Sequence, residues 1–374
     1  MKIGFDAKRA VRNHTGLGNY SRYVIEILSK YYPDNQYILF APEQRQNSRL
    51  KTILLRTNIS FVFPDGISRM FSSLWRISGI KKDIRKNNVV IYHGLSNELP
   101  IGINRTGGVT SVVTIHDLIF LRYPEYYKPI DRAIYRFKFG LACRNADKII
   151  AVSECTKRDI VSFFRIPEEK ITVVYQGCHP AYGAEVSEER KTAVIGKYGL
   201  PPRFLLNVGS IESRKNLRLA VKALKNIPDD IHLVAVGKAT PYQREVEMYA
   251  VKSGLRQRLH LLNSVTFEEL PVIYRLASVF VYPSFFEGFG IPVIEALSSG
   301  VPVIAATGSC LEEAGGPGSI YVNPNDETEL SKQIMTVLTD RELTETMIES
   351  GKEYVKRFSE KTIASAIMNV YESN

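Results

Sequence analysis

Short signatures of several enzyme classes are missing from this chain of 374 residues. It contains no DxD, HExxH or P-loop sequence, so the usual short motifs that hold a divalent cation or a nucleotide phosphate are not there. A GxSxG sequence is missing as well, which weakens a hydrolase interpretation. We therefore predict a protein without a metal ion, in which any phosphate is met by Arg, Lys and helix N-termini.

Paired cysteines and long apolar runs are also missing. The four cysteines are scattered, without CxxC spacing or a His cluster beside them, which argues against both a disulfide framework and a metal site. No apolar run is long enough to span a membrane, and the start, MKIGFDAKRA, is typical of a charged strand rather than a signal peptide. We expect a cytoplasmic location.

Positive charge is abundant but confined to one half of the chain. The net charge is +10, and residues 1–188 hold 28 Lys and Arg against 17 Asp and Glu, whereas residues 189–374 hold 21 against 22. A basic half favours nucleic acid, an anionic membrane surface or a phosphorylated substrate. No known nucleic-acid-binding motif accompanies the charge, so we predict no nucleic-acid partner.

Strand-like runs alternate with helical stretches throughout. Runs such as KIGFDA, NVVIYHG and VTSVVTIHD in the first half, and FLLNVGS, IHLVAVG and VPVIAA in the second, are typical of buried parallel strands. The pattern predicts an α/β fold with two Rossmann-like, doubly wound domains, over residues 1–188 and 189–357. Two such domains facing each other across a cleft would place a ligand at their strand ends.

Two glutamates stand in the stretch SVFVYPSFFEGFGIPVIEALSSGVPVIAA, which predicts a strand, a Gly-flanked loop, a helix and another strand. Glu287 lies in the loop, where a ligand would be met, and Glu295 follows about one turn into the helix. Carboxylates repel phosphate and accept hydrogen bonds from hydroxyls, so the pair suits a ligand that carries both, such as a nucleotide sugar. The alternative is that Glu287 caps the helix and Glu295 lies on its solvated face.

A second strand-to-helix turn, LLNVGSIESRKNLRLA, contains Gly209, Arg214 and Lys215 before a helix that begins near Asn216. The helix dipole disfavours positive charge at this end, so an anion is expected beside the two cations. A diphosphate bridging Arg214, Lys215 and the free N–H groups would satisfy this expectation. The alternative is a solvated surface pair.

Two weaker features lie in the first half. Gly16 and Gly18 open a helix at Asn19, but the third glycine of a dinucleotide-binding loop is missing. Taken by itself, the loop favours a tight turn over a phosphate or sugar contact at the helix N-terminus. His116 and Asp117 end a predicted strand in VVTIHD. A His at a strand end is more often structural than catalytic.

Taken together, these motifs resemble those of the retaining glycosyltransferases with the GT-B fold, in family 4 of the sugar-nucleotide transferases. The resemblance runs from the glycine loop through TIHDL and GSIESRKN to EGFGIPVIEALSSGVPVIA and GSCLEEAGGPGSIYVNPND, and the segment with seven residues between two glutamates is the most specific. The last stretch, KRFSEKTIASAIMNVYES, resembles a terminal helix of the family. It implies that residues 358–374 cross back onto the first domain.

The resemblance implies a role for each residue of the second-half loop. Glu295 would hold the ribose hydroxyls of the nucleotide, and Glu287 would face the transferred sugar. The backbone of Gly288, Phe289 and Gly290 would approach the donor between them.

It also implies that Arg214 and Lys215, in the turn that Gly209 begins, meet the diphosphate. His116 would lie near the sugar and the reacting centre, and the loop with Gly16 and Gly18 would line the donor or acceptor side. The leaving group is good once its charge is met, so no glycosidase-like carboxylate pair and no protein base are expected.

The stretch FLRYPEYY after HDL is most similar to bacterial polysaccharide mannosyltransferases, which use GDP-mannose. Relatives that use UDP-sugars share every motif above, so a UDP-sugar donor stays open. We expect no cofactor besides the nucleotide sugar, and a glycan or lipid-linked acceptor. A GT-B sugar-nucleotide epimerase is the main alternative, whereas a dehydrogenase would need a full G-x-G-x-x-G sequence.

One basic stretch, SRMFSSLWRISGIKKDIRKN over residues 68–87, mixes apolar and cationic side chains. It predicts one amphipathic helix that lies on an anionic membrane, with a peripheral location at the inner face. The alternative is an ordinary helix whose apolar face is core.

Overall fold

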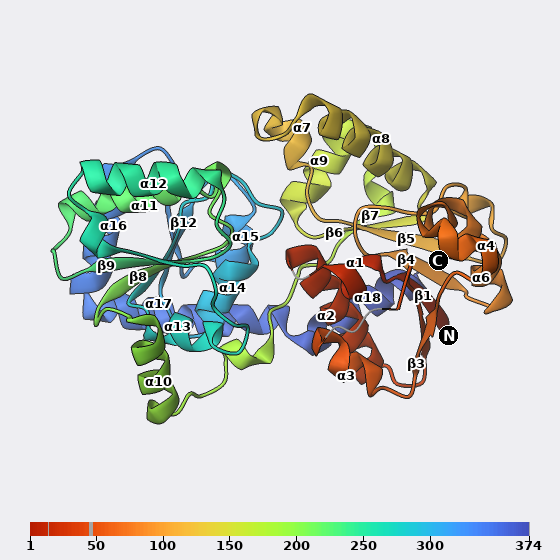
Figure 1. Ribbon diagram of the computed structural model, residues 1–374, viewed down its shortest axis with the longest axis horizontal. Helices are drawn as coiled ribbons and strands as arrows, with labels where there is room; N and C mark the ends of the chain where they lie inside the picture. Colours follow the sequence, from red (N-terminus) through yellow and green to blue (C-terminus); the bar gives the residue numbers. More distant parts are fainter. Residues whose placement is uncertain (14, 45–47, 374) are drawn as a thin grey trace. The chain divides into compact units, whose positions relative to one another are not determined.

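The computed structural model describes residues 1–13, 15–44 and 48–373, and the chain divides into two units (Figure 1). Unit 1 contains residues 1–176 and 360–374, and unit 2 contains residues 177–359. The division falls earlier than residue 188, because the intervening residues pack within unit 2. The ring of Tyr182 meets that of Tyr274 edge-on at 5.4 Å, and the sulfur of Cys178 lies 3.3 Å from Ser298 Oγ.

Unit 1, as far as it is described, is built on one parallel sheet of seven strands in the order β3-β2-β1-β4-β5-β6-β7. The strands are β1 (Lys2–Asp6), β2 (Gln36–Phe40), β3 (Ile59–Val62), β4 (Ile91–Gly94), β5 (Thr110–Ile115), β6 (Lys148–Ala151) and β7 (Ile171–Val173). The order reverses between β1 and β4, so this pair of strands forms the switch point at which α/β sheets commonly bind ligands.

The helices of unit 1 cover both faces of this sheet (Figure 1). They are α1 (Lys8–Arg12), α2 (Gly16–Tyr31), α3 (Lys51–Leu54), α4 (Gly66–Met70), α5 (Ser72–Leu74), the π-helical turn η2 (Trp75–Gly79), α6 (Ile80–Lys86), α7 (Ile119–Arg122), α8 (Pro129–Asn145), α9 (Glu154–Phe164) and α18 (Glu360–Glu372). Short 3₁₀ turns are η1 (Ser48–Leu50), η3 (Ile103–Arg105), η4 (Pro124–Tyr126) and η5 (Glu168–Lys170).

The terminal helix α18 belongs to unit 1. Ile363 and Ile367 are buried in the same apolar core as Ile3 and Val24. The hydroxyl of Tyr371 also lies 2.7 Å from His93 Nδ1 at the end of β4. The chain therefore returns from unit 2 to complete the core of unit 1.

Unit 2 has a six-stranded parallel sheet in the order β10-β9-β8-β11-β12-β13. The strands are β8 (Phe204–Val208), β9 (His232–Val236), β10 (Leu259–Leu262), β11 (Val279–Tyr282), β12 (Val303–Ala306) and β13 (Ile320–Val322). The helices and 3₁₀ turns are η6 (Pro180–Tyr182), α10 (Glu188–Tyr198), η7 (Ser213–Lys215), α11 (Leu217–Ala223), η8 (Leu224–Asn226), α12 (Pro241–Lys252), η9 (Arg256–Arg258), α13 (Leu270–Leu276), α14 (Ile291–Ser298), α15 (Leu311–Gly315), α16 (Glu327–Thr339), α17 (Arg341–Tyr354) and η10 (Val355–Phe358). The order reverses between β8 and β11. Two Rossmann-like α/β units confirm the predicted fold class.

The strands that the sequence pattern did not indicate, β3, β10 and β13, are all edge strands. Their residues are mostly half-exposed, unlike the fully buried β8, β11 and β12. An edge strand has a partner on one side alone, so it lacks the continuous apolar run that marks a central parallel strand.

The prediction of a single helix over residues 68–87 is wrong. The segment is broken into α4, α5, η2 and α6, and the π-helical turn η2 places Trp75 and Ile80, five residues apart, in one buried cluster. Arg76 is turned inward, with its Nη1 atom 2.8 Å from a carboxylate oxygen of Asp6 and a second ion pair to Glu98. No described helix is long and apolar enough to cross a membrane.

Candidate functional site

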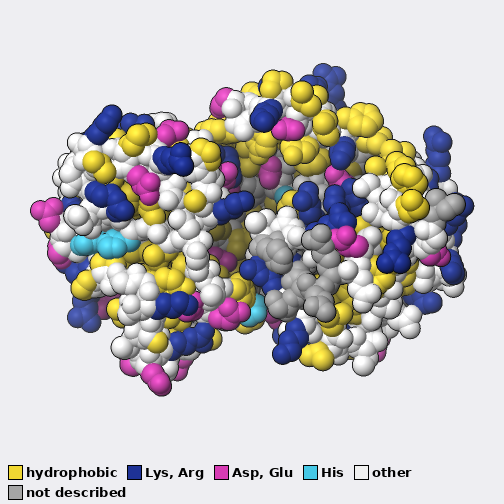
Figure 2. All heavy atoms as spheres, viewed as in Figure 1, with side chains coloured by type: hydrophobic (Ala, Val, Ile, Leu, Met, Phe, Trp, Pro, Cys, Tyr) yellow, Lys and Arg dark blue, Asp and Glu magenta, His cyan; other side chains and the backbone are white. Residues whose placement is uncertain are grey.

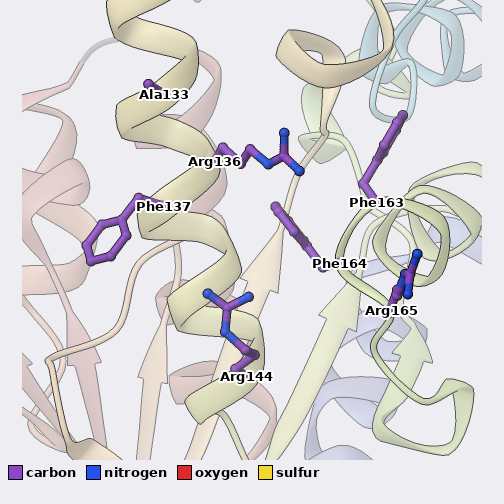
Figure 3. Close-up of a pocket in the computed structure, with 7 residues that line it drawn as sticks. All are labelled: Ala133, Arg136, Phe137, Arg144, Phe163, Phe164 and Arg165. Carbon is purple, nitrogen blue, oxygen red and sulfur yellow. The ribbon is translucent and has the colours of Figure 1, made fainter.

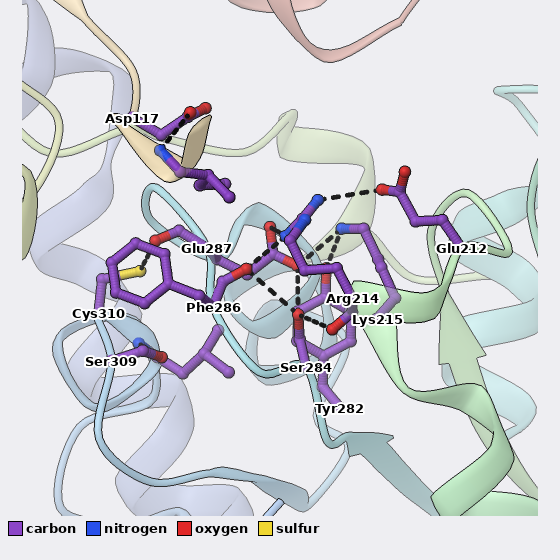
Figure 4. Close-up of polar contacts among 12 residues, drawn as sticks. Asp117, Glu212, Arg214, Lys215, Tyr282, Ser284, Phe286, Glu287, Ser309 and Cys310 are labelled. Atoms are coloured by element: carbon purple, nitrogen blue, oxygen red, sulfur yellow. Dashed lines mark hydrogen bonds and ion pairs between the residues drawn. The ribbon is translucent and has the colours of Figure 1, made fainter. Parts of the chain in front are cut away.

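The switch point of unit 2 brings together two loops that are far apart in the sequence (Figure 4). The strands β8 and β11 pair in parallel, so the turn after β8 and the loop after β11 leave the sheet at the same edge. The first loop contains Arg214 and Lys215, and the second contains Glu287. The predicted residues of these two motifs are thus brought into direct contact.

The carboxylate of Glu287 is the centre of this cluster. Its Oε1 atom accepts hydrogen bonds from Lys215 Nζ at 2.8 Å and Tyr282 Oη at 3.0 Å. Ser284 Oγ donates to the same oxygen at 2.8 Å, and Arg214 Nη1 lies 2.9 Å from Oε2. Three donors thus meet Oε1 and one meets Oε2, so Glu287 is held in one orientation.

Opposite charges decide the ionisation of this cluster. Burial alone would raise the pKa of Glu287, but the nearby charges of Arg214 and Lys215 outweigh it and lower the pKa to about 2. Burial lowers the pKa of Arg214, and Glu287 and Glu212 together raise it above its ordinary value. An anion was expected beside Arg214 and Lys215 because of the helix dipole. In the protein alone, the side chain of Glu287 is that anion.

Glycine shapes the turn after β8. Gly209 has a φ of +149°, and a Cβ atom there would lie 2.9 Å from Cδ of Lys215. The missing side chain therefore leaves the space through which Lys215 reaches Glu287. Lys215 is followed by Asn216 in the left-handed conformation, whose amide Nδ2 donates to the carbonyls of Pro283 and Pro324 at 3.1 and 2.7 Å.

Contacts with Cys310 and α15 hold the loop after β11 in place. Cys310 Sγ donates to the carbonyl oxygen of Glu287 at 2.9 Å. Gly290 has a φ of +126°, and a Cβ atom there would lie 2.9 Å from Leu311. Gly288 is half-exposed, whereas Phe289 is buried and meets Phe358 edge-on. These contacts hold the loop closely packed against α15 up to the start of α14.

Glu295 lies on α14 and has a different set of neighbours. The hydroxyl of Tyr274 donates to Glu295 Oε2 at 2.8 Å, and Tyr182 provides a second hydrogen bond. The residue keeps a half-exposed surface, but its carboxyl head lies among tyrosine rings. Desolvation raises the pKa of this carboxyl to about 7, although both tyrosine hydroxyls act to lower it. The pKa values of the two glutamates are thus shifted in opposite directions.

His116 follows β5 of unit 1 and is buried. Its Nε2 atom lies 2.9 Å from the carbonyl oxygen of Leu95, and its Nδ1 atom lies 3.1 Å from the amide of Gln176. A carbonyl only accepts, so Nε2 carries the proton and Nδ1 accepts from Gln176. Desolvation lowers the pKa of His116 to about 4, which keeps the imidazole neutral.

The glycine loop of unit 1 opens α2, as its spacing indicated. A Cβ atom at Gly18 would lie 2.0 Å from the carbonyl oxygen of Asn13, so close packing alone requires a glycine there. Gly16, the first residue of α2, has nothing within 4 Å of such an atom. The contact of this loop with a ligand stays a prediction.

Several residues of the site were not indicated by the sequence pattern. Tyr282 and Ser284 bind Glu287, and Tyr274 and Tyr182 surround Glu295. Tyr282 is the last residue of β11, and a polar-ended side chain at the end of a buried strand was the one signal that could have revealed it. Within the described ranges, no group of three or more His, Cys, Asp or Glu side chains could hold a metal ion.

The arrangement defines a class of protein. Two Rossmann-like units in one chain, with cations and carboxylates at a strand-end switch point, form the GT-B architecture of glycosyltransferases. The described chain superimposes over its full length on HepE from Anabaena in complex with UDP and glucose, with a TM-score of 0.77 and 18% identity, covering all of both chains.

Sequence comparisons place the chain within this class. The model of glycosyl transferases group 1 matches residues 191–354, and that of glycosyltransferase family 4 matches residues 16–182. The O-antigen chain mannosyltransferase B of Escherichia coli is 31% identical over 288 residues, 75% of this chain and 74% of that protein. The O-antigen chain mannosyltransferase RfbU of Salmonella typhimurium is 29% identical over 225 residues, 60% of each chain. The chain belongs to glycosyltransferase family 4, as its motifs predicted.

Proposed function

We propose that this glycosyltransferase moves a mannosyl group from GDP-mannose, with retention of anomeric configuration, to a glycan or lipid-linked acceptor during cell-surface polysaccharide synthesis. The similar proteins named as O-antigen mannosyltransferases in Escherichia coli and Salmonella typhimurium support the sugar and the pathway class. The charged cluster of unit 2 supports the chemistry. The single observation that carries the proposal is the pairing of Arg214 and Lys215 with Glu287 at a strand-end switch point.

The donor diphosphate would be met by the two cations. Arg214 and Lys215 are each only 14% exposed in their side chains, so their charges are weakly screened and can act strongly on a bound phosphate. In the protein alone, Glu287 forms an ion pair with each of them and holds them in place. A bound diphosphate would contact Arg214 and Lys215 together with Glu287. The carboxylate of Glu287 would then also accept a hydrogen bond from a hydroxyl of the transferred sugar.

The nucleoside would be held by Glu295. A ribose diol offers two hydroxyl donors, and a carboxylate on the first turns of α14 can accept both. Desolvation raises the pKa of Glu295 to about 7. Hydrogen bonds from the ribose hydroxyls would favour the charged form of this carboxyl. The tyrosines that surround the carboxyl fix its direction.

The reaction breaks the bond between the sugar's anomeric carbon and the diphosphate oxygen and forms one to an acceptor oxygen. Negative charge develops on the leaving diphosphate, and Arg214 and Lys215 stabilise it without a metal ion. The acceptor proton passes to the donor phosphate as it leaves. Glu287 already accepts four hydrogen bonds and its pKa is lowered to about 2, so it is a poor proton donor of the glycosidase type.

The donor is tested by thermal shift with GDP, UDP and ADP and their sugars, followed by turnover with each sugar that binds. We expect GDP and GDP-mannose to raise the melting temperature most, and the product to be an α-mannoside by NMR. Preferential binding and turnover of a UDP-sugar would move the proposal to the alternative donor. Epimerisation of the donor with no acceptor present would replace it altogether.

The division of roles between the glutamates is tested by Glu295→Ala and Glu287→Ala. Glu295→Ala should weaken GDP binding by about 0.5–1.5 kcal/mol, the usual net contribution of a hydrogen bond. Glu287→Ala should mainly reduce turnover. Calorimetry with GDP on both variants decides the matter, and equal losses of GDP affinity would contradict the division.

We further propose a cytoplasmic location with peripheral contact to the inner face of the membrane. After the burial of Trp75 and the pairing of Arg76, the segment over 68–87 still has exposed apolar and basic side chains, and Lys81 is half-exposed. The exposed apolar and basic residues are Arg69, Met70, Phe71, Leu74, Ile77, Lys82, Arg85 and Lys86. A lipid-linked acceptor would itself lie at the membrane. Binding to anionic vesicles that fails at high salt is the expected result, and no binding at low salt would contradict it.

A further inference from the structure

His116 has a protein partner at each of its polar atoms. Its backbone N–H donates to Asn97 Oδ1 at 2.7 Å, and Thr156 Oγ1 donates to its carbonyl oxygen at 3.4 Å. In the imidazole ring, Nε2 donates to the carbonyl oxygen of Leu95 at 2.9 Å, and Nδ1 accepts from the side-chain amide of Gln176 at 3.1 Å. Nδ1 carries the lone pair that can take up a proton, so Gln176 occupies the one basic atom of the neutral ring.

Tyr20 fixes the plane of this ring. The ring of Tyr20 meets that of His116 edge-on at 4.5 Å, and its hydroxyl lies 3.2 Å from Thr114 Oγ1 in β5. Tyr20 lies on α2 and is buried in the apolar core of unit 1, where close packing leaves it little freedom to turn. The imidazole is therefore held in one plane, with Nδ1 directed at Gln176.

Gln176 is itself buried and lies where the chain leaves unit 1. It is 7% exposed and is the last residue of that unit. Two residues earlier, Val174 is buried, and its N–H donates to the carbonyl oxygen of Ala151 at the end of β6, so the backbone is anchored to the sheet. Among the described residues, the side-chain amide of Gln176 forms a hydrogen bond to His116 alone. A buried amide with this one partner indicates a role toward the histidine.

His116 lies where unit 1 would meet a ligand. It directly follows β5, which neighbours β4 of the switch point, and ligands of α/β sheets bind at this edge. Lys and Arg side chains gather on the face of unit 1 that Figure 2 shows. A charged imidazole would add to this positive charge, whereas a neutral one does not.

The groups around His116 act in the same direction. Burial lowers its pKa to about 4, and the charge of Arg9 on α1 also lowers it, against a hydrogen bond to Leu95 that raises it. The other titratable groups that interact with it are Tyr20 on α2 and His93 on β4, and burial lowers the pKa of His93 to about 3. Neither of these groups places a negative charge beside the ring at neutral pH.

A separate cavity in unit 1 does not involve these residues (Figure 3). It has a volume of about 420 Å³ and lies between α8 and the end of α9, where Arg144 and Phe164 are among its lining residues. Thr156, which donates to the carbonyl oxygen of His116, lies near the start of α9. A ligand in this cavity would leave the hydrogen bond between Gln176 and His116 in place.

We propose that Gln176 is a positioning residue for the transfer reaction. By occupying Nδ1, it keeps His116 neutral, with the proton on Nε2 and the ring in one orientation beside the transferred sugar. Cleavage of the bond to the diphosphate places positive charge on the anomeric carbon, which a neutral ring does not repel and an imidazolium ring would. This inference rests on the proposed transfer reaction and on the expected place of His116 near the sugar.

The first test reads the histidine itself and needs no substrate. Nitrogen NMR on protein with labelled histidines distinguishes a ring nitrogen that carries a proton from one that does not, and His116→Gln assigns the signals. At neutral pH, we expect a proton on Nε2 of His116 and none on Nδ1. A proton on Nδ1 in the unmodified protein would overturn the proposal, whether or not the variants below fold.

Two variants of Gln176 test its effect on turnover. Gln176→Met is similar in size but gives no hydrogen bond, and Gln176→Glu supplies a carboxylate that favours a proton on Nδ1. Both should lower kcat about 10-fold, as expected for one lost hydrogen bond. The KM for the donor should stay within about twofold, because a loss confined to kcat marks an interaction made in the transition state.

The pH profile separates positioning from a merely structural role. Gln176→Glu should raise the pKa of His116, so its ring is charged at neutral pH in the NMR spectrum and loses that charge as the pH rises. The kcat of this variant should therefore increase with pH over a range in which that of Gln176→Met changes in parallel with the unmodified protein. Parallel profiles for both variants and the unmodified protein would contradict the proposal.

Gln36→Glu is the matched control. It makes the same chemical change at an exposed position at the start of β2, at the opposite edge of the parallel sheet from His116. Its kcat, its pH profile and its His116 signals should match those of the unmodified protein. If Gln36→Glu lowers kcat as much as Gln176→Glu does, added charge in unit 1 explains the loss and the positioning role is wrong.

The choice of substrate keeps this inference distinct from the proposed function. The assays use whichever nucleotide sugar the unmodified protein turns over, so a UDP-sugar donor would correct the proposed donor without affecting the comparison of variants. If the unmodified protein transfers mannose from GDP-mannose and both Gln176 variants do so at its rate, the positioning role fails while the proposed function stands.

Discussion

The ammonium group of Lys215 lies 2.8 Å from a carboxylate oxygen of Glu287, and this ion pair joins the two strand ends at the switch point of unit 2. The residues are 72 positions apart in the chain, and both side chains are largely buried. A buried pair is costly to separate, because removing one partner leaves the other charge without compensation. If the donor diphosphate binds these cations as proposed, the stability of unit 2 and its affinity for a diphosphate are linked.

Glu287→Gln should destabilise the protein. The change leaves Lys215 buried without its counter-ion and Arg214 with Glu212 as its acidic partner, and we expect the free energy of unfolding to fall by about 3–5 kcal/mol. Urea denaturation followed by circular dichroism measures this change. Added GDP should restore part of the loss, since its phosphates replace the missing charge.

The control for this prediction is Glu212→Gln. Glu212 also pairs with Arg214, at 3.0 Å, but its side chain is 43% exposed. Exposed pairs contribute about 0–1 kcal/mol, so this variant should be nearly as stable as the unmodified protein. Similar losses for the two variants would argue against the central position of Glu287.

Lys215→Ala should weaken the binding of GDP much more than that of guanosine. In the proposed donor site Lys215 meets a phosphate, and guanosine has none. Titration calorimetry with both ligands gives the ratio of affinities, which should fall about 10-fold or more if a charge-assisted hydrogen bond of roughly 1.5–3 kcal/mol is lost. Equal weakening for both ligands would place Lys215 elsewhere than at the phosphate.

The affinity for GDP should increase with pH through about 7 and then level off. Desolvation raises the pKa of Glu295 to about 7, so below that pH the carboxyl must lose a proton before it can accept both ribose hydroxyls. The affinity should fall by up to about tenfold per pH unit below this point. Calorimetry at pH values from about 5.5 to about 8.5, which bracket the pKa of Glu295, measures the affinity for GDP.

Glu295→Gln supplies the reference for this pH profile. GDP itself titrates in the same range, and this contribution is the same in both proteins. The difference between the two profiles therefore isolates the carboxyl group. Parallel profiles would show that Glu295 does not take part in binding.

Unit 1 should lose stability as the pH falls below about 6.5. Desolvation lowers the pKa of His93 to about 3 and that of His116 to about 4, whereas the unfolded chain binds protons at the ordinary value of about 6.5. The stabilisation is complete above that value and declines as the pH falls toward the folded pKa. With two groups the expected slope is about 2.7 kcal/mol per pH unit between roughly pH 4 and 6.

The single tryptophan makes this loss measurable in unit 1 alone. Trp75 is buried in the core of unit 1, so its fluorescence follows the unfolding of that unit. His93→Gln should reduce the pH slope by about half, since one of the two groups is removed. An unchanged slope in this variant would rule out His93 as a source of the acid sensitivity.

The sequence was sufficient for those features that depend on local pattern. Buried parallel strands are continuous apolar runs, so most central strands of both sheets were predicted, as was the loop-and-helix position of Glu287 and Glu295. Gly209 marked the turn before Arg214 and Lys215, because glycine easily adopts the positive φ that this turn requires. Family membership also followed from local motifs.

Tertiary structure alone decided which side chains meet. Edge strands and the broken segment over 68–87 depended on partners that no local pattern reveals, and the pairing of Arg76 with Asp6 turned a presumed surface charge inward. The counter-ion of Lys215 was another residue of the chain, brought there because β8 and β11 are neighbours. Burial among tyrosines gave Glu295 a pKa near 7, and salt bridges gave Glu287 one near 2. Two residues of one type thus differ in pKa, because desolvation and ion pairing arise only when distant segments pack together.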